Sequence, residues 1–83
     1  MTASAGAYLG LDIGTTGVKA ALFSASGAML GAGLAEYTLE TPRPDIVELD
    51  AEVYWQSSCA AIAAALKNAR IDAAAVRSVG VTG

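Results

Sequence analysis

The stretch that decides the fold is residues 10–19, which reads Gly-Leu-Asp-Ile-Gly-Thr-Thr-Gly-Val-Lys. An alternating apolar segment, residues 8–13, runs into it, and a second apolar segment, residues 18–24, leaves it. Alternation with a period of two is typical of a β-strand. Only residues 14–17 connect the two segments, so they are predicted to pair as an antiparallel hairpin.

The predicted turn carries groups that a phosphate would meet. Gly14 and Gly17 let the backbone bend sharply and approach a ligand closely. Backbone amides in such a turn can converge on an anion, and Thr15 and Thr16 add hydroxyl donors. Lys19 supplies a positive charge just beyond the turn. The sequence therefore predicts a phosphate-binding hairpin.

Asp12 ends the first predicted strand and is expected to point toward the same space. Its carboxylate is the candidate ligand for Mg²⁺, through water, because magnesium dehydrates reluctantly. The Walker loop and the dinucleotide fingerprint, two better-known phosphate loops, each open a helix. Here the loop joins two strands, so the predicted geometry is that of a hairpin clamp.

The same residues also have ordinary structural readings, which the sequence alone leaves open. Asp12 can be a strand-end carboxylate that caps a local turn. Thr15 and Thr16 are common in turns between strands, and Lys19 can be a solvated lysine on an edge strand.

Further along the chain, residues 28–37 are predicted to form a third strand after a tight turn in which Gly27 is free to take a positive φ. Gly31 and Gly33 are expected to weaken this strand. Residues 41–45 are predicted to be irregular, since neither of their prolines can donate a ladder hydrogen bond.

The clearest helix is predicted to begin after Asp50, whose carboxylate suits the N-cap. Asp50 and Glu48 are read as capping and loop residues and not as a catalytic pair. Asp72 is expected to cap a short second turn before a fourth strand at residues 76–82. Four larger residues share one stripe of the helix and are predicted to be core: Trp55, Cys59, Ile62 and Leu66.

These elements give an α/β fold with the order βββαβ, in which a helix crossover returns the last strand to the side of the hairpin. Residues 1–7 are small and polar and are predicted to be frayed. The chain stops at Gly83, directly after a strand, where a connecting loop would be expected, so the domain is predicted to be incomplete.

The hairpin resembles that of the ATPase superfamily that includes actin, Hsp70-type chaperones, hexokinases and the FGGY carbohydrate kinases. Residues 17–19, Gly-Val-Lys, resemble the xylulose kinase branch of the FGGY family. Residues 44–55 read Pro-x-x-x-Glu-x-Asp-x-x-x-Tyr-Trp, which is similar to the segment ahead of that family's first long helix. Residues 76–83 resemble the strand that follows. Ile46 and Ala51 depart from the pattern, where an aromatic residue and a proline are common.

The resemblance implies that residues 1–83 are the N-terminal part of the first domain of an FGGY kinase, an incomplete half-domain of the actin-like ATPase (ribonuclease H-like) fold. It implies transfer of the ATP γ-phosphate to a sugar hydroxyl, with D-xylulose or a related pentulose favoured. ATP and Mg²⁺ would be the cofactors, with the metal on Asp12. The phosphates would lie on Asp12, Gly14, Thr15, Thr16, Gly17 and Lys19.

No residue of the chain matches the family's general-base aspartate, its sugar-contacting residues or its adenosine-binding domain, so the fragment alone is predicted to be inactive. Two alternatives remain: a non-catalytic nucleotide-binding module like actin or the chaperones, and a small module that binds no nucleotide. A sugar, through the missing remainder of the enzyme, is the implied partner. Self-association through exposed apolar surface is a further expectation.

Composition excludes other classes of function. The net charge is −3 and the five basic residues are scattered, which opposes binding to nucleic acid. No apolar run approaches the ~20 residues of a membrane-spanning helix, and the N-terminus does not read as a signal peptide. The chain has one cysteine and no histidine, which excludes an internal disulfide and a Cys- or His-based metal cluster. The expected location is the cytoplasm.

Overall fold

The structure is a computed structural model, and β1 (Ala7–Ile13) is one of the two inner strands of its main sheet. The structure describes residues 6–37, 40–43, 46–48 and 51–83. The remaining elements are β2 (Gly17–Phe23), β3 (Met29–Glu36), β4 (Glu40–Arg43), β5 (Ile46–Glu48), α1 (Ala51–Ala69), a 3₁₀ turn (Ala73–Ala75) and β6 (Val76–Thr82).

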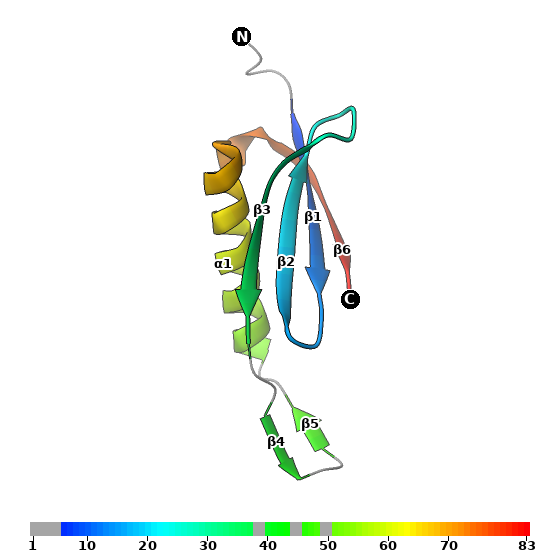
Figure 1. Ribbon diagram of the computed structural model, residues 1–83, viewed down its shortest axis with the longest axis vertical. Coiled ribbons are helices and arrows are strands. Elements are labelled where there is room, and N and C mark those ends of the chain that lie inside the picture. Colours follow the sequence, from blue (N-terminus) through cyan, green and yellow to red (C-terminus); the bar gives the residue numbers. More distant parts are fainter. Residues whose placement is uncertain (1–5, 38–39, 44–45, 49–50) are drawn as a thin grey trace.

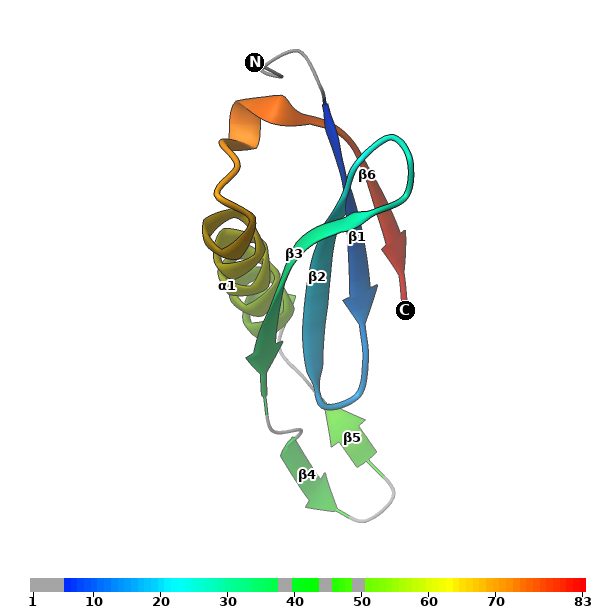
Figure 2. The same cartoon turned by 45° about the horizontal axis from the view of Figure 1, so that its top comes forward.

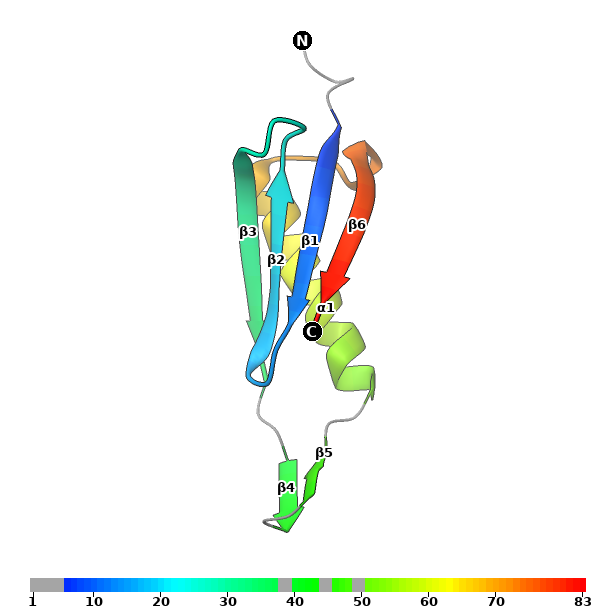
Figure 3. The same cartoon turned by 90° about the vertical axis from the view of Figure 1, so that its right-hand side faces the viewer.

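The main sheet has the strand order β3-β2-β1-β6 (Figures 1 and 3). The pairs β1–β2 and β2–β3 are antiparallel, and β6 lies parallel to β1 on its other side. Because parallel neighbours need a long crossover, α1 runs between β3 and β6 across one face of the sheet, as Figure 2 shows. The predicted antiparallel meander and the returning fourth strand are confirmed.

The hydrophobic core lies between α1 and the sheet. Alternate residues of β1 and β2 point toward the helix, where Leu9, Val18 and Leu22 are buried. The helix meets them with Ala61 and Ala65, both fully buried. No charged or polar side chain among the described residues is buried.

Gly31 and Gly33 of β3 are the sites where the helix approaches most closely. A Cβ built on Gly33 would lie 2.3 Å from the carbonyl oxygen of Ala61, and one on Gly31 would lie 2.6 Å from the amide nitrogen of Ala69. The side-chain amide of Asn68 donates to the Ala32 carbonyl across the same contact, at 2.7 Å. The two glycines therefore allow the helix backbone to pack closely on β3. The sequence analysis expected only that they would weaken the strand.

The predicted core stripe of the helix is wrong in its first half. Trp55 is 67% exposed and Cys59 is also exposed, whereas Ile62 and Leu66 are partly buried against the core. Backbone approach at the glycines of β3 favours the smallest side chains, so the alanine face turns to the sheet. The larger residues are displaced to the flank of the helix.

Two boundaries also differ from the prediction. Ala7 belongs to β1 and is buried, so the segment predicted to be frayed is too long by at least this residue. The predicted irregular stretch, residues 41–45, overlaps β4, which pairs with β5 as a separate two-stranded sheet. Pro42 is tolerated because the ladder is irregular between Glu40 and Arg43, and an irregular edge requires fewer donors.

Other predicted features can be placed directly. Gly27 has a φ of 90°, and Asp72 accepts a hydrogen bond from the Ala74 amide at 3.0 Å as the N-cap of the 3₁₀ turn, both as predicted. The predicted N-cap residue Asp50 lies outside the described residues. Within the described part of the chain, no helix combines the length and the apolar character needed to cross a membrane.

The close contact at Gly33 makes a test of the fold. Gly33→Ala is expected to lower the free energy of unfolding by about 1–3 kcal/mol, because the added methyl group has to displace the helix backbone. Gly80→Ala, in β6 of the same sheet, is the matched control, since nothing lies within 4 Å of its Cβ position. Thermal unfolding followed by circular dichroism measures both, and equal effects of the two substitutions would contradict the packing described.

Candidate phosphate-binding site

The turn between β1 and β2 is held by a hydrogen bond from the Gly14 amide to the Gly17 carbonyl, at 2.9 Å. The last strand pair before it is Ile13 with Val18. Thr15 and Thr16 are exposed at the tip. The predicted hairpin turn is therefore present, with both threonines accessible to a ligand.

The structure gives different reasons for a glycine at position 14 and at position 17 of the turn. A Cβ on Gly17 would lie 2.6 Å from the Ala35 carbonyl oxygen, so this glycine is needed where β2 meets β3. A Cβ on Gly14 would meet only the Gly17 carbonyl, at an ordinary 3.5 Å. Neither has a φ in the left-handed region. Gly17 is thus explained by packing within the sheet, whereas at Gly14 the backbone stays open to approach.

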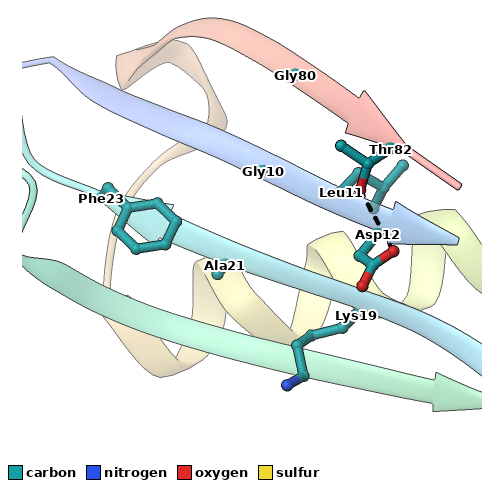
Figure 4. Close-up of a pocket in the computed structure, with 8 residues that line it drawn as sticks. All are labelled: Gly10, Leu11, Asp12, Lys19, Ala21, Phe23, Gly80 and Thr82. Atoms are coloured by element: carbon teal, nitrogen blue, oxygen red, sulfur yellow. Dashed lines mark hydrogen bonds between the residues drawn. The ribbon is translucent and has the colours of Figure 1, made fainter.

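Asp12 lies in the same cross-strand row as Lys19 on β2 and Thr82 on β6. The Thr82 hydroxyl donates to Oδ1 of Asp12 at 3.3 Å (Figure 4). Lys19 points its ammonium group away from this carboxylate in Figure 4. Asp12 is exposed, so its second oxygen remains accessible to a metal or a phosphate-bound water.

Thr82 is a site residue that the sequence reading missed. Its hydroxyl reaches Asp12 only because β6 pairs parallel to β1 in the register that places these two residues side by side. The sequence predicted the strand that carries Thr82, but it did not predict which residue of β1 would lie beside Thr82.

An open groove of about 320 Å³ adjoins Asp12 on the face of the sheet opposite α1. Its floor is made of small residues on three neighbouring strands, Gly10, Ala21 and Gly80. Phe23 lines it at one end and the row of Asp12 at the other. The absence of large side chains between them makes space beside the carboxylate.

The donor set fits magnesium held mainly by its substrate. Among the described residues, no group of three or more acidic, His or Cys side chains is placed to bind a metal. Mg²⁺ commonly keeps several waters and binds one or two carboxylates together with substrate phosphates. One exposed carboxylate, Asp12, beside the candidate phosphate-binding turn agrees with that mode.

Tyr37 is the second residue that the sequence reading missed. It follows β3, and its amide donates to the Thr16 carbonyl at 3.0 Å. Its hydroxyl donates to the Gly14 carbonyl, so one residue holds two carbonyls of the turn. Partial burial raises the pKa of the Tyr37 phenol above its usual value, and the neighbouring Tyr54 adds to the shift.

With this geometry in view, the comparisons with known proteins identify the chain. The model for the FGGY family of carbohydrate kinases, N-terminal domain, matches residues 7–83. The chain belongs to the FGGY family of carbohydrate kinases. A glycerol kinase from Trichormus variabilis is 37% identical over 81 residues, which are 98% of this chain and 16% of the relative. A glycerol kinase from Bordetella pertussis is 40% identical over 74 residues, which are 89% of this chain and 15% of the relative.

The fold of this FGGY chain agrees with a solved structure. The crystal structure of a xyloylose kinase from Brucella ovis superposes with a TM-score of 0.83 at 32% identity, over 90% of this chain and 16% of that chain. The sheet and its helix are therefore part of an actin-like, ribonuclease H-like half-domain, which confirms the predicted fold class. The chain spans about one sixth of the length of these relatives.

The hydrogen bond from Tyr37 predicts a dependence on alkaline pH. The neutral phenol is the donor, and its pKa is raised in the folded state, so its contribution to stability is fully present below about pH 10 and is lost as the pH rises through the folded pKa. The unfolding midpoints of the wild-type chain and of Tyr37→Phe, measured from pH 8 upward, are expected to converge. A difference between the two midpoints that stays constant as the pH rises would contradict this pH dependence.

Proposed function

We propose that the complete protein containing these residues is a kinase that transfers the ATP γ-phosphate to a hydroxyl group of a sugar or polyol. The main support is the position of Asp12 beside the β1–β2 turn, in a chain of the FGGY family. The turn supplies donors for phosphate oxygens, and the carboxylate supplies a metal ligand. Both are at the same end of the sheet.

Two acceptors have support. Residues 17–19, Gly-Val-Lys, favour D-xylulose or a related pentulose, and the structural neighbour from Brucella ovis is named a xyloylose kinase. The similar glycerol kinases favour glycerol. We take the pentulose as the first candidate, on residues 17–19 and the structural neighbour, and glycerol as the second. One assay with both acceptors separates them.

In phosphoryl transfer the protein contributes mainly positioning and stabilisation of charge. The exposed Thr15 and Thr16 bind phosphate oxygens through their amides and hydroxyls. Gly14 leaves the backbone open to close approach. Lys19 offsets part of the negative charge of the phosphates. Asp12, oriented by Thr82, would hold Mg²⁺, which when bound neutralises the charge that develops on the phosphate oxygens.

These 83 residues provide, in this proposal, the phosphate-binding part of the first domain and do not catalyse alone. They correspond to 16% of the length of the relative from Trichormus variabilis, and the acceptor pocket, the general base and the adenosine site are assigned to the remaining length. A cytoplasmic location remains a prediction from the sequence.

The kinase assignment is tested in the enzyme expressed from the complete reading frame. Asp12→Asn is expected to lower kcat by about two orders of magnitude or more, since an amide is a poor magnesium ligand and one well-placed electrostatic contact has this size. Glu36→Gln, which neutralises an exposed carboxylate outside the Asp12 row, is expected to leave kcat near that of the wild type. ADP release with D-xylulose and with glycerol measures both variants and selects the acceptor.

Two outcomes of this assay would contradict the proposal. The first is the absence of sugar-dependent ADP release with any ketose, polyol or aldonate. The second is ATP turnover that ignores sugars and responds to a protein partner, which would favour the non-catalytic nucleotide-binding alternative.

We also propose that the 83-residue chain self-associates through apolar side chains outside its core. Trp55 on α1 is 67% exposed, and Val79 and Val81 on β6 are 54% and 59% exposed. Such exposure of large apolar residues is typical of a surface that packs against a partner. In the isolated chain, which lacks the remainder of the enzyme, a second copy takes the place of that partner.

Trp55→Gln is expected to weaken self-association about tenfold or more, because burial of a large apolar side chain contributes roughly 1.5–3 kcal/mol. Lys67→Gln, an exposed position on the same helix, is the control and is expected to have little effect. Sedimentation velocity over a range of concentrations measures the association. A wild-type chain that stays monomeric throughout that range would exclude it.

A further inference from the structure

Tyr37 contacts the β1–β2 turn with both its backbone and its side chain. The amide donates to the Thr16 carbonyl at 3.0 Å, and the phenol hydroxyl donates to the Gly14 carbonyl. Gly14 and Thr16 flank Thr15 at the tip of the turn. A single residue therefore fixes the orientation of the two peptide groups on either side of the tip.

The ring of Tyr37 is itself anchored. It packs edge-on against Tyr54 in the first turns of α1, with ring centroids 5.5 Å apart and planes at 80°, which is a favoured arrangement of aromatic rings. It also packs against the hydrophobic core. Figure 1 shows the β1–β2 turn, the end of β3 and the start of α1 at the same end of the sheet. Tyr37 thus joins the turn to the helix.

Within the turn, three backbone carbonyls are hydrogen-bonded to other described residues, whereas two backbone amides are not. The carbonyls of Gly14 and Thr16 accept from Tyr37, and the carbonyl of Gly17 accepts from the Gly14 amide. The amides of Thr15 and Thr16 donate to no backbone carbonyl in the described part of the chain. Carbonyl oxygens repel a phosphate and amides attract it, so this division suits an anion.

We propose that Tyr37 is a positioning residue for the phosphate-binding turn, an inference that rests on the proposed function. It holds the carbonyls of Gly14 and Thr16, and because the Gly14 carbonyl and the Thr15 amide belong to one peptide group, the Thr15 amide stays available to phosphate oxygens. Tyr37 touches no reacting atom. Its effect is to order the turn before the ligand arrives, which lowers the cost of binding.

Amide hydrogen exchange of the 83-residue chain, measured by NMR, tests whether Tyr37 holds the turn. In Tyr37→Phe, which keeps the ring and removes the hydroxyl, the amides of Gly14 and residue 37 are expected to exchange about two- to tenfold faster, the effect of one lost hydrogen bond. The β2–β3 turn is an internal control, because the Gly27 and Ser24 amides there make comparable bonds at 2.9 and 2.8 Å. Unchanged exchange at Gly14, or equal acceleration in both turns, would overturn the proposal, since equal acceleration reports only a global loss of stability.

Titration with Mg·ATP and with magnesium tripolyphosphate, followed at the amides of Thr15 and Thr16, tests whether this order serves phosphate binding. Tyr37→Phe is expected to bind both ligands several-fold more weakly than the wild type. Tyr54→Phe keeps the ring contact and makes no bond to the turn, so its affinity is expected to be unchanged. Faster exchange without weaker binding would overturn the positioning role. If the wild-type chain responds to neither ligand, phosphate binding by this chain is contradicted, and the exchange rates still decide whether Tyr37 holds the turn.

Discussion

The close approach of α1 to β3 is the packing constraint on which the rest of this structure depends. At Gly33 the helix backbone lies so near that a Cβ would stand 2.3 Å from the Ala61 carbonyl oxygen. Alanine side chains bury little area each, and a helix of alanines covers a sheet effectively only when the two backbones nearly touch. Without side chains at two positions of β3, an alanine face is enough to close the core over β1 and β2.

The same packing places the start of the helix at the end of the sheet that carries the β1–β2 turn. Tyr54 lies in the first turns of α1, and its ring meets that of Tyr37 at the end of β3. From there, two hydrogen bonds reach the turn, at Gly14 and Thr16. The order of the turn therefore depends on the seating of the helix, although the turn itself is a short local connection. Core packing and site geometry are coupled through Tyr37.

The sequence was sufficient for features that depend on local chemistry. The alternation in residues 8–13 and 18–24, joined by a glycine- and threonine-containing turn, specified the first hairpin to within one residue at each strand boundary. Asp72 was recognised as a cap because capping needs only a carboxylate and the next amides. The candidate site residues Asp12 and Lys19 could also be chosen from local sequence. They flank the turn in the chain, and antiparallel pairing puts them opposite each other.

Features that depend on tertiary contacts were not accessible in this way. Helical periodicity places Trp55 and Cys59 on the stripe of Ile62 and Leu66, but it cannot say that glycines in another strand will select the alanine face of the helix. Tyr37 is an ordinary aromatic residue at a strand end until the fold shows which carbonyls its hydroxyl reaches.

The site as a whole is less local than its most recognisable part. The turn forms between adjacent strands, but the hydroxyl that orients Asp12 comes from Thr82, 70 residues further along the chain. That residue arrives only after the chain has crossed the sheet through α1 and paired β6 parallel to β1. A hairpin of residues 8–24 would thus carry the glycines, the threonines and the carboxylate. It would lack the hydrogen bonds from Thr82 and Tyr37 that hold them. The turn sequence is therefore one part of the candidate site, and the crossover helix and β6 bring Tyr54 and Thr82 to it.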